Sequence, residues 1–273
     1  MNQVISLLKE NLWDKKWIIL IMGGLIGLLG FGIILLLGTM DMTSIQSVLE
    51  TFPSGFLDFF GDSLAAISTP YGFFSLEFLN FIWLYAGIFM VYIASSLLSQ
   101  EVEEKTIDLA LTKPIKRYQF LGSKIYFLAV FIGAILGVTF LLVTLGVLTS
   151  PTFLEYGMYL DRLWATYLIT TLFLMALSMI TFLFSTIFLK SKKSLAFGIA
   201  VFFTMYFITS FAPYMQDAEL IKFISIFTYF NPTQYLVHAN GFVFFRDLII
   251  MSSVNTALII GSLLIFNKKD IPN

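Results

Sequence analysis

Residues 100–117 form the densest group of ionisable side chains in the chain, and they lie between two long apolar runs. The segment reads QEVEEKTIDLALTKPIKR and begins with the carboxylates Glu101, Glu103 and Glu104. Closely spaced carboxylates beside basic residues can bind the complementary charges of a soluble partner. They can equally belong to a solvated loop whose basic residues anchor the neighbouring apolar runs. The residues alone favour neither interpretation.

The local pattern predicts a helix at the start of this segment. The glutamates would lie at its N-terminal end, where carboxylates oppose the positive end of the helix dipole. Val102, Ile107, Leu109 and Leu111 would form a narrow apolar face. Pro114 would end the helix, because proline forces the preceding residue out of the α region.

Other kinds of chemistry have little support in the sequence. The chain has no Cys, which excludes disulfides and thiolate metal sites, and a lone histidine such as His238 is more often structural than a metal ligand. No Ser, His and Asp set falls at one membrane depth, so we expect neither a catalytic site nor a metal site. The phosphate-binding pattern Gly-x-x-x-x-Gly-Lys-Ser/Thr is also missing, so the chain cannot bind ATP in that way.

The composition places the chain in the membrane. Hydrophobic residues make up 58% of it and charged residues only 12%, about half of the charged fraction of a soluble domain. The net charge of -1 gives no attraction to nucleic acid. The fold class expected is therefore an all-α integral membrane protein.

Six runs are long enough to cross about 30 Å of hydrocarbon. They are residues 17–38, 78–98, 125–148, 163–189, 194–212 and 248–266. The first run is too long for the apolar region of a cleaved signal, so we expect it to be retained. None of the six ranges holds an ionisable residue, which argues against a proton- or sodium-coupled transporter.

The basic residues predict the orientation. Of the 16 Lys and Arg residues, 13 fall on the side that holds both termini, and only Arg162, Lys222 and Arg246 fall on the other. The positive-inside rule then places both termini in the cytoplasm. The expected anchors at the inner face are Lys15, Lys16, Lys124, Lys190, Lys192 and Lys193.

Three linkers are too apolar to be simple loops. Residues 1–16 show the spacing of an amphipathic helix lying on the inner surface, with an ordinary polar tail as the alternative. Residues 39–77 are expected to pack on the outer membrane surface. Residues 213–246 are too short to span twice, so we expect a re-entrant or interfacial hairpin before the last span.

A few polar residues inside the spans could line a path, although Ser and Thr in helices usually bond to their own backbone or to a neighbouring helix. They are Asn80, Thr139, Thr144, Thr166, Thr170, Thr204 and Asn255. Two Gly-x-x-x-Gly pairs, Gly23 with Gly27 and Gly133 with Gly137, permit close helix approach, either to a second copy or within one subunit.

The charged segment resembles the signature of ABC-2-type permeases, the membrane subunits of one class of ATP-binding-cassette exporters. That signature is roughly Glu-x-Glu-x-Gly-Thr, a Leu-rich turn, Pro, Arg three residues later and Lys ten residues after the Pro. The matching residues here are Glu101, Glu103, Thr106, Leu109, Pro114, Arg117 and Lys124, and Lys105 stands in place of the usual Gly. The motif Phe230-Asn231-Pro232-x-x-Tyr235 also resembles a Pro-aromatic element of that family.

The resemblance implies that residues 100–117 couple the chain to a separate ABC ATP-binding subunit, with Glu104 among the acidic residues held by that partner. It implies no cofactor on this chain, with ATP and Mg on the partner, and a second permease subunit of the same or a related kind. It also implies residence in the cytoplasmic membrane of a prokaryote. The abundance of Phe, Leu and Met suggests a lipophilic or amphipathic cargo. The alternative is a membrane scaffold or sensor that binds a soluble partner through the same segment without transport.

Overall fold

Helices account for nearly all of the residues that this computed structural model describes, which are 13–39, 67, 69–104, 117–212 and 219–269. No strand occurs in those ranges. Six helical stretches are long and apolar enough to cross a membrane. The predicted fold class, an all-α integral membrane protein, is therefore confirmed.

Five of the six stretches are single helices. They are α2 (Lys16–Thr39), α10 (Arg117–Thr149), α12 (Leu160–Phe188), α13 (Ser191–Phe211) and α15 (Gly241–Lys268). Each includes the range predicted for it to within one residue, and several extend well beyond it. The largest extension is at α10, which begins at Arg117 rather than at residue 125.

The second stretch, Pro70–Glu103, changes its helical form along its length. It consists of α6 (Pro70–Glu77), the 3₁₀ turn η1 (Leu79–Phe81), the π turn η2 (Trp83–Gly87), α7 (Ile88–Ser96) and α8 (Ser99–Glu103). Thr69 caps its start by accepting a hydrogen bond from the Gly72 amide at 3.0 Å. Tight and wide turns inside a helix often mark a hinge or a functional position.

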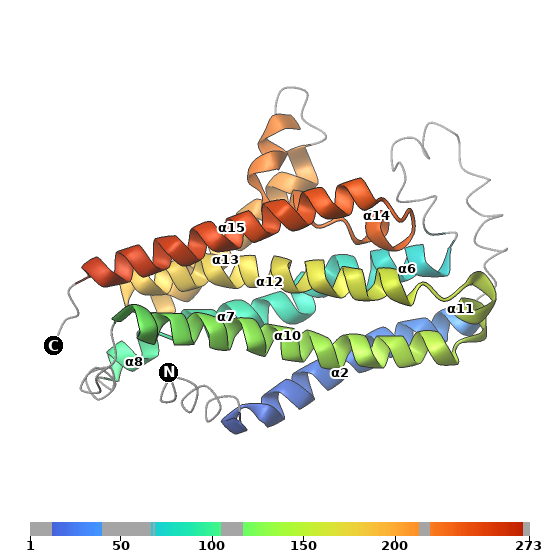
Figure 1. The fold of residues 1–273 in the computed structure, drawn as a ribbon, viewed down its shortest axis with the longest axis horizontal. Coiled ribbons are helices and arrows are strands. Elements are labelled where there is room, and N and C mark those ends of the chain that lie inside the picture. The colour runs from blue at the N-terminus through green and yellow to red at the C-terminus, as the bar shows by residue number, and fades with distance from the viewer. Residues whose placement is uncertain (1–12, 40–66, 68, 105–116, 213–218, 270–273) are drawn as a thin grey trace.

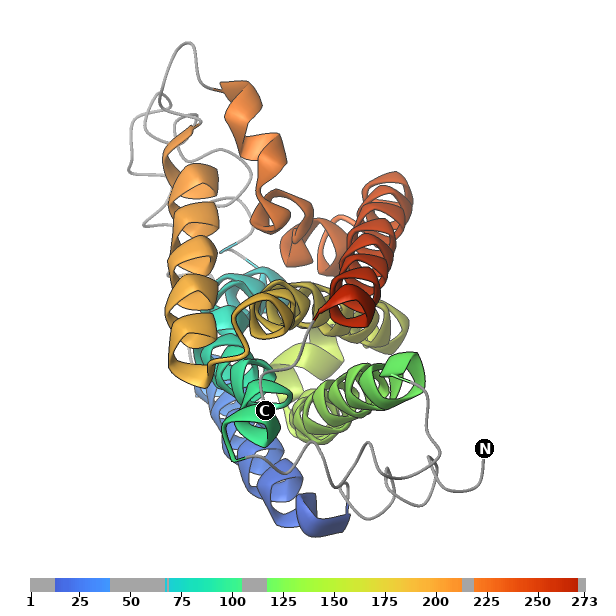
Figure 2. The same ribbon diagram turned by 90° about the vertical axis from the view of Figure 1, so that its left-hand side faces the viewer.

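Helix α12 lies at the centre of the bundle. It packs against α7, α10, α13 and α15, while α2 packs mainly against α10. Figure 1 shows these helices running lengthwise, and Figure 2 shows the others grouped around α12.

Short helices fill the connections between the long ones. They are α11 (Pro151–Tyr156), η4 (Glu219–Ile224), η5 (Ile226–Tyr229) and α14 (Pro232–Leu236). The last three lie where the interfacial hairpin is predicted, and its relation to a membrane surface stays a prediction. We call the end with α11 and α14 the α11 end, and the end with α8 and the start of α10 the α8 end (Figure 1).

Both Gly-x-x-x-Gly pairs pack within the subunit. A Cβ at Gly23 would lie 2.7 Å from the Ile135 carbonyl oxygen of α10, and one at Gly27 would lie 2.7 Å from Leu142. Gly133 faces α12, where the Tyr167 hydroxyl donates to its carbonyl at 3.1 Å. The close approaches that these glycines allow are therefore used inside one chain.

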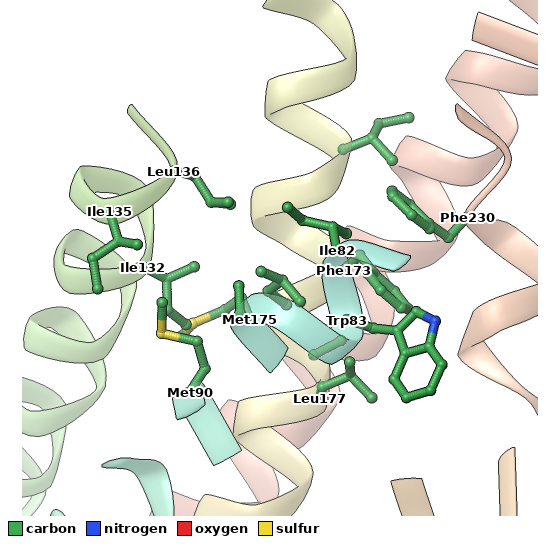
Figure 3. Close-up of a cluster of buried hydrophobic side chains, with 14 of the residues drawn as sticks. Ile82, Trp83, Met90, Ile132, Ile135, Leu136, Phe173, Met175, Leu177 and Phe230 are labelled. Atoms are coloured by element: carbon green, nitrogen blue, oxygen red, sulfur yellow. The ribbon is translucent and has the colours of Figure 1, made fainter. Parts of the chain in front are cut away.

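The core between α7, α10 and α12 is a continuous layer of aliphatic, aromatic and thioether side chains. Figure 3 shows Ile132, Met90 and Met175 on one side of α12 and Trp83 with Phe230 on the other. The rings of Phe173 and Phe230 stack with centroids 4.4 Å apart and planes 3° apart. This stacking holds the connection after η5 against the central helix.

Candidate coupling site

Helix α8 carries the acidic residues at its C-terminal end. It continues from α7 and ends at Glu103, with Glu104 as its C-cap. As predicted, Glu101 lies in the first turn of a helix, but that helix is short and continues the stretch of the second span, so Glu103 and Glu104 lie at its end. Three of the candidate coupling residues, Thr106, Leu109 and Pro114, lie outside the described residues.

Glu101 forms an ion pair with Lys124 of α10. Both side chains are partly buried, with 31% of Glu101 and 12% of Lys124 exposed. A pair at that depth is screened less than one on an open surface. The contact joins α8 to the first turns of α10, so Lys124 does more than anchor a span.

Glu103 caps the start of another helix. Its carboxylate accepts from the Ser191 amide at 3.3 Å and from the Ser191 hydroxyl at 2.9 Å. Ser191 is the first residue of α13, so the carboxylate lies at the positive end of that helix dipole. The dipole contact inferred from the sequence thus exists, but with α13 instead of with the helix of Glu103 itself.

A buried cluster of serines lies directly behind α8. The Ser185 hydroxyl of α12 donates to Ser99 Oγ at 3.0 Å and lies 3.2 Å from the Ser95 carbonyl oxygen. The Ser99 amide donates to Ser185 Oγ at 3.2 Å, and the hydroxyls of Ser99 and Ser191 lie 3.2 Å apart. The cluster therefore joins α8 to both α12 and α13.

The turn between α12 and α13 presents Ser191 to this cluster. Only Leu189 and Lys190 separate the two helices, and Leu189 has a φ of 51°, in the left-handed region. A non-glycine residue there is strained, and its side chain is buried, so packing holds the turn in place.

Glu104 is exposed, as Glu103 is, but it differs from the other two glutamates in its contacts. Among the described residues its carboxylate accepts one hydrogen bond, from Gln100 Nε2 at 2.7 Å, and the side chain is exposed. Of the three carboxylates, Glu104 is therefore the one best placed to meet an external surface.

Arg117 holds the end of the last helix. Its Nη1 donates to the carbonyl of Lys269, the C-cap of α15, at 2.9 Å, and Lys269 Nζ donates to the Ile187 carbonyl at 2.6 Å. Cations at helix C-termini are stabilising. The predicted anchors Lys190, Lys192 and Lys193 are exposed. The Lys16 Nζ lies 3.6 Å from the centroid of the Trp13 ring. Lys15 is partly exposed.

Most of the candidate path residues bond within the bundle. All five threonines donate to the carbonyl four residues earlier in their own helix, namely Thr139, Thr144, Thr166, Thr170 and Thr204. Asn255 donates to the Leu172 and Met251 carbonyls at 2.9 Å each. Only Asn80 lines a large cavity, of about 720 Å³, between the second span and α13.

The sequence reasoning missed a buried carboxylate at the α11 end. Asp247 is fully buried and accepts from the Tyr235 hydroxyl at 2.6 Å, from Asn231 Nδ2 at 3.1 Å and from Arg246 Nε at 2.8 Å. Burial, and then the hydrogen bond to Asp247, raises the pKa of the Tyr235 hydroxyl, so it stays a donor. Helix α15 begins at Gly241, which brings Arg246 and Asp247 into its second turn.

Two signals in the sequence could have revealed these contacts. The first is the adjacent pair Arg246-Asp247 beside the motif that contains Asn231 and Tyr235. The second is the set of serines, Ser95, Ser99 and Ser185, where two predicted spans end on the same side.

Comparison with known families explains the overall arrangement. A family model described as ABC-2 family transporter protein matches residues 18–271. The chain belongs to the ABC-2 family. No curated protein matches the sequence. The family consists of membrane transport subunits of ABC transporters, and membership implies association with the membrane and with an ABC ATP-binding subunit. The ABC-2 resemblance inferred from residues 100–117 is therefore confirmed.

Proposed function

We propose that this ABC-2 chain is the transmembrane subunit of an ATP-driven exporter and receives its energy through residues 100–117. The observation that carries the proposal is the way α8 is fastened. Glu101 ties it to α10, Glu103 ties it to α13, and the serine cluster ties it to α12. A displacement of α8 would therefore reach three membrane helices at once.

The three glutamates would have two different roles. Glu104 is exposed and would bind the ATPase subunit, whereas Glu101 and Glu103 would transmit its movement into the bundle. The serine cluster supports this role, because its hydroxyls can exchange partners without leaving a buried charge unpaired.

The working unit would hold two permease subunits and two ATPase subunits, which carry the ATP and Mg. It would lie in the cytoplasmic membrane of a prokaryote with the α8 end and both termini in the cytoplasm. The placement of Lys124, Lys190, Lys192 and Lys193 near the α8 end supports this orientation. The cargo would be lipophilic or amphipathic.

The competing function is a scaffold or sensor that binds a soluble partner through the same segment. The contacts of α8 with three helices favour transport, because they could pass a displacement of α8 to those helices. A scaffold would need only an exposed surface that binds its partner. A stable complex with an ATPase that moves no cargo would favour the scaffold.

The test is recovery of an ATPase subunit with the affinity-tagged chain from its own cell membranes. Glu104→Lys reverses the exposed charge, and across an interface such a reversal can cost several kcal/mol. We expect the ATPase to be lost while the variant still inserts. Glu155→Lys is the matched control, since Glu155 is an exposed acid on α11 at the other end. If Glu104→Lys and the double variant with Glu101→Lys both retain the ATPase and transport, the proposed docking site is wrong.

A further inference from the structure

A cavity of about 720 Å³ opens where the second membrane stretch changes its helical form. The 3₁₀ turn η1 and the π turn η2 lie along one side of it, and α13 with η5 lies along the other. Its volume falls in the range of sites that bind small organic molecules, about 300–1,000 Å³. The 3₁₀ and π turns therefore lie where the cavity is, and such turns within a helix often occur at functional sites.

Aromatic residues are the largest group in the lining. Phe81, Trp83, Tyr206, Phe227 and Phe230 all line the cavity. The Trp83 ring lies 4.5 Å from that of Tyr206 and 5.9 Å from that of Phe227, measured between centroids. The faces of such rings carry negative charge density and attract cations.

Among the described residues, one acidic side chain lines the cavity, that of Glu77 at the end of α6, and it is exposed. In the part of the chain that the structure describes, its carboxylate has no hydrogen bond and no ion pair. The Asn80 amide, the Trp83 indole N–H and the Tyr206 hydroxyl also lack hydrogen-bond partners there. These groups offer a ligand one carboxylate and several hydrogen-bond donors beside apolar ring faces, the combination that small-molecule sites use.

The charge pattern identifies the class of ligand. Among the described residues no basic side chain lines the cavity, and the Glu77 carboxylate shares the lining with five aromatic rings. An anion would meet Glu77 without a counter-charge, whereas an organic cation would pair with the carboxylate and lie against the rings.

We propose that this cavity binds a lipophilic organic cation, with Glu77 as its counter-ion and the Trp83 and Tyr206 rings against its apolar body. That this ligand is a cargo rests on the proposed export function. The binding itself does not depend on that function.

Tetraphenylphosphonium and tetraphenylborate make a suitable pair of probes, because they share a shape and differ in the sign of their charge. The full chain is placed in nanodiscs of phosphatidylglycerol, a lipid without an ammonium group. Trp13→Phe, Trp17→Phe and Trp164→Phe leave Trp83 as the single reporter among the four tryptophans. Saturation of the Trp83 fluorescence change is measured, and equilibrium dialysis repeats the measurement on the chain with all its tryptophans.

We expect saturable binding of the phosphonium and none of the borate. Glu77→Gln keeps the size and removes the charge, and it should weaken phosphonium binding about tenfold or more. Glu77→Asp keeps the charge and should retain most of the binding. Glu155→Gln removes an exposed acid elsewhere at the α11 end and should change nothing.

Equal binding of both probes, no saturable phosphonium binding, or a Glu77→Gln variant that binds like the parent chain would overturn the proposal. Nanodiscs with phosphatidylethanolamine distinguish the source of the cation, since competition would show that a lipid ammonium group also occupies the site. Because no ATPase is present, a negative result leaves the coupling proposal standing. Conversely, loss of the ATPase in the Glu104→Lys test leaves the binding result unaffected.

Discussion

The two ends of the bundle are held together by different chemistry. At the α8 end, a partly buried ion pair, a cap on α13 and neutral serine hydroxyls join four helices. At the α11 end, the fully buried carboxylate of Asp247 accepts three hydrogen bonds. The donors are Tyr235 of α14, Asn231 at the N-cap of α14 and Arg246 of α15. Hydroxyl contacts can rearrange at small cost, whereas a buried carboxylate that loses its donors cannot. If the proposed coupling holds, movement would begin at the α8 end and the α11 end would resist it.

The aromatic residues also distinguish the two ends of the bundle. The rings of Trp83, Tyr206, Phe227 and Phe230 lie between the middle of the bundle and the α11 end, where they stack or meet edge to face. The Tyr71 hydroxyl further ties α6 to the loop after α11, since it donates to the Gly157 carbonyl at 3.0 Å and accepts from the Tyr159 amide at 3.0 Å. A stiff wall of this kind suits a binding cavity whose shape must persist.

The largest effect expected concerns which end faces the outside of the cell. The chain has no Cys, so Glu155→Cys on α11 and Lys192→Cys on α13 each create a single exposed thiol. In intact cells a membrane-impermeant maleimide should label the first and not the second. Labelling of both in permeabilised cells is the control. The opposite pattern would reverse the orientation and remove the basis for an ATPase at the α8 end.

The next largest effect is expected from Asp247→Ala. The substitution leaves the buried donors of Tyr235 and Asn231 without their acceptor, and removal of one partner from a buried charged network costs about 3 kcal/mol. A clear fall in the thermal unfolding midpoint of the purified chain is expected, with a smaller fall for Asp247→Asn, which keeps one oxygen. An unchanged midpoint for Asp247→Ala would mean that the α11 end is not held by this residue.

A smaller effect on stability is expected from Glu103→Ala, because loss of a helix cap costs about 1 kcal/mol. Its effect on coupling should be larger, since of the links from α8 to α13 only the Ser99–Ser191 contact would remain. Transport and ATP hydrolysis measured in the same vesicles should give less cargo moved per ATP, with the ATPase still bound. Glu103→Gln, which can still accept from Ser191, should keep most of the parent ratio. A parent-like ratio in Glu103→Ala would assign transmission to the Glu101–Lys124 pair.

Much of the fold could be predicted from residue order. Long apolar runs that cross a membrane are expected to be helical, because lipid offers no hydrogen-bond partner for the backbone N–H and C=O groups. The ends of those helices were harder to place. Glu103 and Asp247 lie in helices that run past the apolar runs, and hydropathy carries no information about a helix that continues into polar sequence.

The candidate site was predicted as a segment but not as a set of contacts. The motif around Glu101 and Arg117 identified the region and the family, since both depend on residue types at fixed spacing. The partners Lys124, Ser191 and Lys269 are 23, 88 and 152 residues away from Glu101, Glu103 and Arg117. Contacts at such separations depend on how the helices pack.

The sequence by itself determined that this is a six-helix membrane protein of the ABC-2 family, because hydrophobicity and local spacing are properties of consecutive residues. Only the tertiary structure decided that Glu101 and Glu103 bond to other helices and that Glu104 bonds within its own. It also decided that the glycine pairs pack within one subunit, and that Glu77 and Asn80 share an aromatic cavity with α13. These features arise where separate helices meet, and the same side chain costs or contributes free energy according to what faces it there.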